Sequence, residues 1–148
     1  MTCDVPARRL RGSLPGGEPR APSVIVCAFT ILVLKIALKV AGFAPTIGWL
    51  RSHVPAISQA PNRASEIVSA AERAVATAGA VYPGRALCLE QSLALYYLLR
   101  RQGLPVKYCQ GVQPHPFEAH AWVEYDGHPV NDVREHVRLF ARLPDQLP

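Results

Sequence analysis

The sequence has few cysteines, and none of them form a close pair. Only Cys3, Cys27, Cys88 and Cys109 occur among 148 residues, and there is no CxxC motif. A small secreted domain held together by disulfides, or a redox or zinc CxxC site, would need more cysteines or closer spacing. We therefore predict reduced thiols and a cytoplasmic protein.

Acidic charge is also scarce, with 11 acidic against 16 basic residues and a net charge of +5. A basic balance can indicate nucleic-acid binding, but no basic run is interleaved with the aromatic residues that stack on bases. The arginines gather in the first 22 residues and near the end, which is typical of a solubilising tail and of solvated helix faces. We predict no nucleic-acid partner, while an acidic peptide or protein partner stays open.

A long apolar run is missing as well. Residues 24–34 carry no charge, but Lys35 and Lys39 follow. A transmembrane helix needs about 20 apolar residues and would have to bury both lysines. A signal peptide would need a small-x-small cleavage site soon after the run, and none follows. The run predicts a core helix that ends near Gly42 with its lysines on a solvated stripe; peripheral membrane contact through residues 24–42 is the alternative.

The length and composition of the chain fit a single domain. The chain is 49% apolar and 18% charged, which is typical of a globular protein. Residues 1–22 are rich in proline and glycine and predict a disordered tail. Residues 23–148 then form the domain. A helix is predicted over residues 63–78, capped by Gly79, because its apolar positions recur at helical spacing. Those positions are Ala64, Ile67, Val68, Ala71, Val75 and Ala78.

The second half of the chain mixes one strong helix with short strands. A leucine-rich helix is predicted to stop at Gly103, with a proline two residues later. Alternating apolar positions and turn residues then predict strands. The predicted elements are a short helix at 43–53, the helix at 86–101, strands at 106–112, 119–125 and 128–133, a rigid loop at 113–118 and a helix at 134–142. The pattern predicts an α+β fold with helices packed on a small antiparallel sheet.

Cys88 lies in the first turn of that leucine-rich helix. A thiol acts as a nucleophile only as its thiolate, and a free thiol with a pKa of about 8.5 is mostly protonated at neutral pH. Backbone N–H groups and the helix dipole at a helix start favour the thiolate. A small buried apolar side chain is the alternative interpretation of a lone cysteine in such a helix.

The hairpin downstream favours the catalytic interpretation. A three-residue loop, Tyr125-Asp126-Gly127, would place His120 directly opposite Asp132 on one face of the sheet. A two-residue turn would send Asp132 to the other face. We predict the three-residue loop. Cys88, His120 and Asp132 are then the candidate nucleophile, base and orienting carboxylate.

Other residues near this constellation are weaker candidates. Trp122 shares the predicted face of His120 and would screen the pair from water, although ordinary packing explains it equally well. Tyr108 and Phe117 are candidates to line a substrate cleft, and either Gln110 or Gln113 is a candidate to donate to an oxyanion beside the Cys88 N–H. A zinc site from Cys88, Cys109, His115, His120 and His128 was considered, but their spacings of 21, 6, 5 and 8 match no usual ligand pattern. We predict no metal.

Three segments resemble one known family. They read CLEQSLALYYLLRRQGLPV (88–106), PFEAHAWVEYDGHPVND (116–132) and RLFARLP (138–144). Together with the apolar helix before them, they are similar to the transglutaminase-like cysteine peptidases of lasso peptide biosynthesis. The likeness is greatest to the stand-alone leader peptidase, and it covers roughly residues 24–144.

The resemblance implies a papain-like, transglutaminase-like core with a Cys88–His120–Asp132 triad and no cofactor. It implies removal of the leader from a ribosomally made precursor through a thioester. It also implies two partners, a small leader-recognition protein that presents the precursor and an ATP-dependent cyclase that closes the ring. Two alternatives stay open: an acyl transferase in which an amine attacks the thioester, and a non-catalytic module that only binds the precursor.

Overall fold

Four helices come first in the chain and a small sheet follows. The structure is a computed structural model that describes residues 20–57, 62–81, 88–144 and 147–148. The predicted disordered tail, residues 1–22, lies outside the described residues as far as position 19. The helices are α1 (Val24–Val40), α2 (Phe43–His53), α3 (Ala64–Ala80) and α4 (Cys88–Arg100). They are followed by β1 (Val106–Pro114), β2 (Phe117–Tyr125), β3 (His128–Pro129), α5 (Arg134–Val137) and β4 (Ala141–Arg142).

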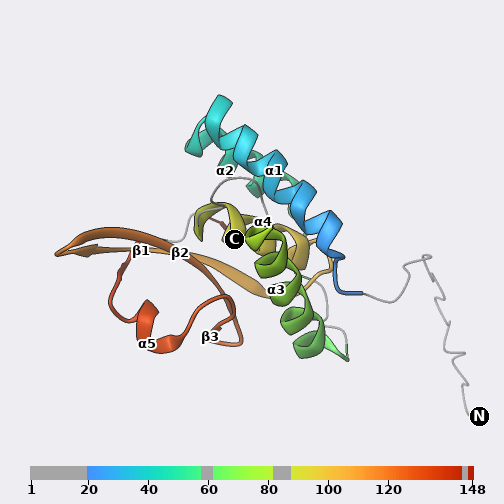
Figure 1. The fold of residues 1–148 in the computed structure, drawn as a ribbon. Helices are drawn as coiled ribbons and strands as arrows, with labels where there is room; N and C mark the ends of the chain where they lie inside the picture. The colour runs from blue at the N-terminus through green and yellow to red at the C-terminus, as the bar shows by residue number, and fades with distance from the viewer. Residues whose placement is uncertain (1–19, 58–61, 82–87, 145–146) are drawn as a thin grey trace, which may run out of the picture.

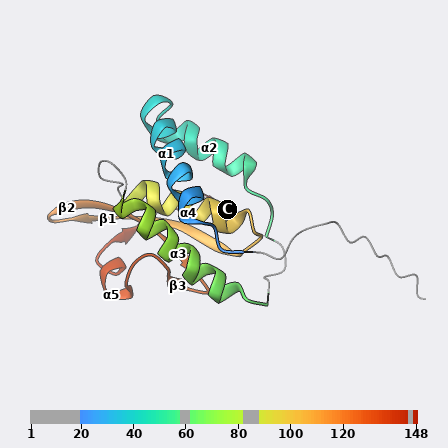
Figure 2. The same cartoon turned by 45° about the vertical axis from the view of Figure 1, so that its right-hand side comes forward.

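The strands form one antiparallel sheet in the order β3-β2-β1-β4 (Figure 1). A cluster of buried residues lies on each face of this sheet. α4 packs on β1 and β2, and α1 and α3 pack against α4. α5 lies on the other side of the sheet in Figures 1 and 2, where Val137 packs against Cys109, Trp122 and Phe140. The predicted α+β fold is confirmed.

The helical core follows the predicted apolar faces. All six predicted positions of α3 are buried. α1 begins after Ser23, whose Oγ accepts a hydrogen bond from the Val26 N–H, and it buries Cys27, Ile31 and Leu34. Its predicted end near Gly42 is confirmed. Within the described ranges, no helix has the length and apolar content that a membrane crossing requires.

The predicted cap at Gly79 is wrong, because α3 runs through Gly79 and ends at Ala80. The Val81 N–H caps the helix by donating to the Thr77 carbonyl at 3.2 Å. The glycine serves packing instead. A Cβ at this position would lie 2.7 Å from the side-chain amide nitrogen of Gln91, so a residue without a side chain lets α4 approach α3.

The predicted loop at residues 113–118 is largely strand. β1 and β2 pair along their whole length, from Val106 opposite Tyr125 to Pro114 opposite Phe117, with only two residues between them. Proline cannot donate to a ladder, which led to the prediction of a loop. Here Pro114 is the last residue of its strand and Pro116 lies in the turn, so neither interrupts the interior of the ladder.

The predicted helix at residues 134–142 is shorter than expected. α5 ends at Val137, and the chain then extends so that Ala141 pairs with Val112 and Arg142 pairs with Gly111. The charged residues at four-residue intervals suggested a longer helix. Phe140 explains the difference, because it is buried against Trp122 and the pairing of β4, which begins at the next residue, holds it at the sheet.

The turn between β2 and β3 also differs from the prediction. Tyr125 pairs with His128, so Asp126 and Gly127 form a two-residue turn and not part of a three-residue loop. Their φ angles are 49° and 73°, the two positive values of a type I′ turn, whose twist matches that of the flanking strands. β3 ends at Pro129, so the strand predicted to reach residue 133 is only two residues long.

Gly111 provides a test of the packing beneath the site, because it pairs with His120. A Cβ at Gly111 would lie 2.7 Å from the Cβ of Phe140 and 3.2 Å from the Cη2 of Trp122. Gly111→Ala is therefore expected to lower the free energy of unfolding by about 1–3 kcal/mol, measured by urea denaturation. Gly48→Ala in α2 is the control, since a Cβ there meets nothing within 4 Å. It should be neutral or stabilise by up to about 1 kcal/mol. Equal stability of both variants would contradict the packing.

Candidate functional site

His120 lies on the face of β2 that is turned away from α4. Its side chain is mostly covered, with 13% exposed. The ring stacks near Trp122 at 6.0 Å between centroids, and the Phe140 ring lies 5.1 Å away. The Nε2 atom is hydrogen-bonded to Oδ2 of Asp132. The imidazole is thus held on its flank by aromatic rings and at one nitrogen by a carboxylate.

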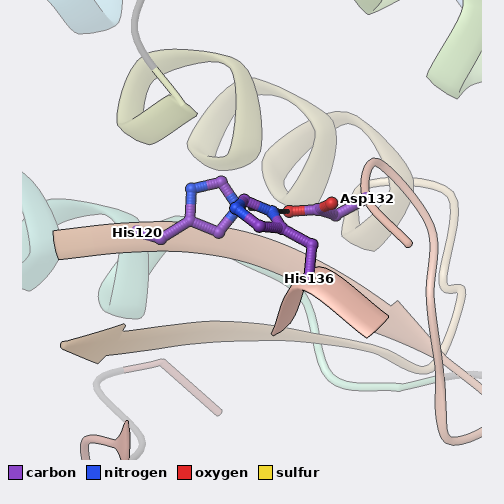
Figure 3. Close-up of side chains that lie close together, drawn as sticks. All are labelled: His120, Asp132 and His136. Carbon is purple, nitrogen blue, oxygen red and sulfur yellow. Dashed lines mark hydrogen bonds and ion pairs between the residues drawn. The ribbon is translucent and has the colours of Figure 1, made fainter. Parts of the chain in front are cut away.

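Asp132 binds two imidazoles at once (Figure 3). His136 donates from Nδ1 to the same Oδ2 atom at 2.8 Å, and the Val133 N–H donates to Oδ1 at 2.7 Å. Burial raises the pKa of the Asp132 carboxyl, but the hydrogen bonds from His136, Val133 and His120 outweigh burial, so the pKa lies below its ordinary value. An ionised carboxylate only accepts hydrogen bonds. His120 therefore carries its proton on Nε2, which leaves the lone pair of the neutral ring on Nδ1.

The predicted contact between His120 and Asp132 is present, although it does not arise from the predicted register. With a two-residue turn, continued pairing would have put Val133 opposite His120 and sent Asp132 to the other face. β3 ends before that point, and the chain bends at residues 130–132. The bend returns the carboxylate to the imidazole.

Asn131 and Asp132 lie along the edge of β2 beyond the end of β3, where β2 has no strand partner on that side among the described residues. Asn131 accepts the Val123 N–H at 2.8 Å in place of a strand partner and donates to Ser92 Oγ at 2.8 Å. Ser92, on α4, donates to the carbonyl of Ala121 at 2.8 Å. One residue thus binds the α4 side of this edge, while the next binds His120 on the opposite face.

Cys88 is the first described residue of α4, one helical turn before Ser92. Ser92 lies beside Ala121, and Tyr96 packs on Tyr108, which pairs with Val123. α4 and β2 therefore run in the same direction. One turn of about 5.4 Å spans nearly two strand residues, so Cys88 lies on the helix side that approaches β2 next to His120.

The first residue of α4 and the His120 imidazole both lie at this edge of β2. Cys88 is half-buried, and no hydrogen bond joins its thiol to His120 among the contacts of the described residues. The thiol lies near Tyr108. Burial is the main reason that the pKa of the Tyr108 hydroxyl is raised, and negative charge on Cys88 and Cys109 raises it further. The structure thus joins His120 to Asp132 and places Cys88 one turn from the contact that fixes α4 to this edge.

The four tentative substrate-binding residues differ in exposure. Tyr108 and Trp122 are buried, with 1% and 2% exposed. They pack within the two cores and offer a substrate little surface. Gln110 donates its Nε2–H to the Tyr108 hydroxyl at 2.7 Å. Phe117 is 80% exposed at the tip of the β1–β2 hairpin, where it can contact a bound chain. Their roles in binding stay predictions.

His136 is the site residue that the sequence did not suggest. It lies on α5 with 39% of its side chain exposed, and its ring centroid is 4.9 Å from that of His120. Its spacing of four residues from Asp132 was the available signal, because such residues share a helix face. The signal was weak, since Asp132 was predicted to lie in a strand and not at the approach to a helix.

A family model for the transglutaminase-like superfamily matches residues 30–144, well over half of the chain. The chain belongs to the transglutaminase-like superfamily. No curated protein and no solved structure shows significant similarity to it. Members of this superfamily are typically cysteine peptidases or acyl transferases, and the match spans Cys88, His120 and Asp132. In this transglutaminase-like domain, three features suit such chemistry: the start of α4 at Cys88, the His120 imidazole on β2 and the Asp132 carboxylate bound to it.

Proposed function

We propose that the protein is a cysteine peptidase that removes the leader from a ribosomally made lasso peptide precursor. The observation that carries the proposal is the pairing of His120 with Asp132 at the open edge of β2, beside the first turn of α4. The superfamily match supports thiol chemistry at this edge.

The hydrogen bonds of Asp132 support the following roles in this proposal. Because Asp132 holds the Nε2 proton, Nδ1 of His120 takes the proton of the Cys88 thiol as Sγ attacks the scissile carbonyl carbon. The C–N bond breaks, the imidazolium returns its proton to the leaving amine, and a thioester to Cys88 remains. Water then attacks the thioester, loses a proton to Nδ1, and the acid and the free thiol are released. Asp132 stabilises the positive charge on the imidazole at each protonated stage.

The substrate assignment rests on the resemblance of the segments around Cys88 and His120 to the stand-alone leader peptidases. In that setting a separate leader-recognition protein presents the precursor, and an ATP-dependent cyclase uses the released core peptide. An exposed Phe117 at the end of the hairpin suits contact with an extended peptide.

The test is to incubate the purified protein with the precursor encoded beside it and the leader-recognition protein, and to follow the products by mass spectrometry. We expect a free leader and a core peptide with a new amino terminus. Addition of a primary amine separates hydrolysis from acyl transfer, because transfer would give an amine adduct of the leader in place of the free acid. Persistence of intact precursor with all partners present would contradict the proposal.

We also propose that α1 rests on an anionic membrane surface. Both sides of this helix are apolar: Cys27, Ile31 and Leu34 are buried, yet apolar side chains also cover the outer side. Those outer residues are Ile25, Val26, Phe29, Leu32, Val33, Ile36 and Val40. A helix that is apolar all round is normally covered. Residues 20–57 contain no acidic residue but include Lys35, Lys39 and Arg51, so anionic lipid headgroups complement the charge of this segment.

A vesicle pelleting assay tests this contact. The protein is expected to pellet with vesicles that contain phosphatidylglycerol and to stay largely in the supernatant with phosphatidylcholine alone. Phe29→Glu should abolish pelleting, because it places a carboxylate on the apolar face. Val81→Glu, at an exposed apolar position after α3, is the matched control and should pellet like the wild type. Equal pelleting of both variants, or a dimer that buries α1 and ignores lipid, would contradict membrane contact.

A further inference from the structure

His120, Asp132 and His136 bring three ligand atoms to one point. One nitrogen of each imidazole and one carboxylate oxygen all lie within 4.8 Å of one another. The three side chains come from β2, from the bend after β3 and from α5 (Figure 3). Two of them are nearly covered, while His136 is 39% exposed and opens the cluster to solvent. A peptidase triad requires only one imidazole here, so the second is unexplained by the proposed function.

We propose that this cluster is a reversible Zn²⁺ site that inhibits the enzyme. Two imidazole nitrogens and one carboxylate oxygen are the protein ligands that many zinc sites use, whereas Mg²⁺ and Ca²⁺ prefer oxygen. Zinc bonds of about 2.1 Å at tetrahedral angles separate ligand atoms by about 3.4 Å. The His136–Asp132 distance is 2.8 Å, so these two ligand atoms must separate by only about 0.6 Å to bind one ion.

Zinc would act by moving a proton within His120. The ion binds Nε2 through its lone pair, so the single proton of the neutral ring shifts to Nδ1. Nδ1 is the atom that takes the thiol proton in the proposed mechanism, and once protonated it cannot act as a base. His136 likewise moves its proton from Nδ1 to Nε2, so no net proton is released from either ring. Zinc binding stands without the proposed function, but its inhibitory effect rests on it.

A site centred on the thiol is the competing arrangement. Zinc also binds thiolates, so Cys88 and His120 alone could capture it in a cysteine peptidase. The two arrangements differ in one ligand each: the cluster requires His136 and does not require Cys88, whereas a thiol-centred site requires Cys88 and does not require His136. Single variants of these two residues therefore separate them.

The experiment measures the zinc affinity of the full chain by competition with a chromophoric chelator. Visible absorption of the Co²⁺-substituted protein provides a second readout that is independent of activity. His136→Ala is expected to weaken zinc binding at least about tenfold, because loss of even an outer partner of a metal ligand costs that much. Cys88→Ala should bind zinc like the wild type. His128→Ala, an exposed histidine on β3 outside the cluster, is the matched control and should also be unaffected.

Wild-type affinity in His136→Ala, or lost affinity in Cys88→Ala, would overturn the proposed site. His136→Gln and circular dichroism exclude unfolding as the cause of a loss, because glutamine keeps a polar side chain next to Asp132. Where precursor cleavage is observed, zinc should inhibit it in the wild type at concentrations that match the measured affinity. Binding without cleavage under any condition would contradict the peptidase proposal and leave the zinc site in place.

Discussion

Cys88→Ala is expected to abolish precursor cleavage, with a loss of at least about a thousandfold in rate and an unchanged fold. The thiolate forms the covalent bond in the proposed mechanism, and an alanine methyl group cannot form a thioester. Cys27 and Cys109 cannot replace it, because both are buried and burial also raises the pKa of the Cys27 thiol. Mass spectrometry of the precursor, with circular dichroism of the variant, measures both parts of the expectation.

Cys27→Ala is the matched control for this variant. It removes a thiol that is fully buried in the α1 core and should leave cleavage intact while lowering thermal stability slightly. The same pair of variants separates an enzyme from a module that only binds the precursor. Binding should survive in Cys88→Ala, and a cleavage rate equal to that of the wild type would remove Cys88 from the proposed mechanism.

The helical half of the fold was predictable because its signal is local. The apolar positions of α3 recur at helical spacing, and one face of a helix is enough to define what it buries. The end of α4 was equally local, since Gly103 adopts φ 77° where the helix stops. The error at Gly79 shows the limit of this approach. Its role depends on Gln91 of another helix, and no nearby sequence pattern contains that contact.

The sheet was less predictable because register depends on partners. The type I′ turn at Asp126 and Gly127 fixes the pairing of β2 with β3, and alternate loops of two or three residues fit the same sequence. Spacing alone suggested that Asp132 faces His120, and the two residues do meet. They meet because Asn131 replaces a strand partner and ends the ladder, which spacing could not reveal.

The second imidazole explains why the site differs from a simple triad. His136 reaches Asp132 only because the chain bends and α5 begins two residues later, an arrangement that requires the packing of Val137 and Phe140 beneath it. The short helix α5 thus positions a residue that no motif identified. The Asp132 carboxylate binds both rings, so variants of the two histidines separate the base from the second ring.

His120→Ala is expected to lower the cleavage rate by about 10²- to 10⁴-fold, the usual contribution of a general base. His120 is next to Ala121, whose carbonyl accepts the Ser92 hydroxyl of α4. His120 is therefore the imidazole nearer to the start of α4. His136 approaches the same carboxylate from α5 and is half-exposed. His136→Ala should therefore cost less than His120→Ala, through loosening of Asp132 and not through loss of the base. Single-turnover cleavage rates of both variants, with circular dichroism to check folding, give the comparison.

The ranking of the two histidine variants is the decisive result. If His136→Ala is as slow as His120→Ala or slower while both are folded, His136 is the base and the roles assigned to the two rings are reversed. The double variant refines the comparison. Two residues that act through one carboxylate are not additive, so the double variant should be no slower than His120→Ala alone. A further loss in the double variant would mean that each imidazole reaches the reaction by a separate route.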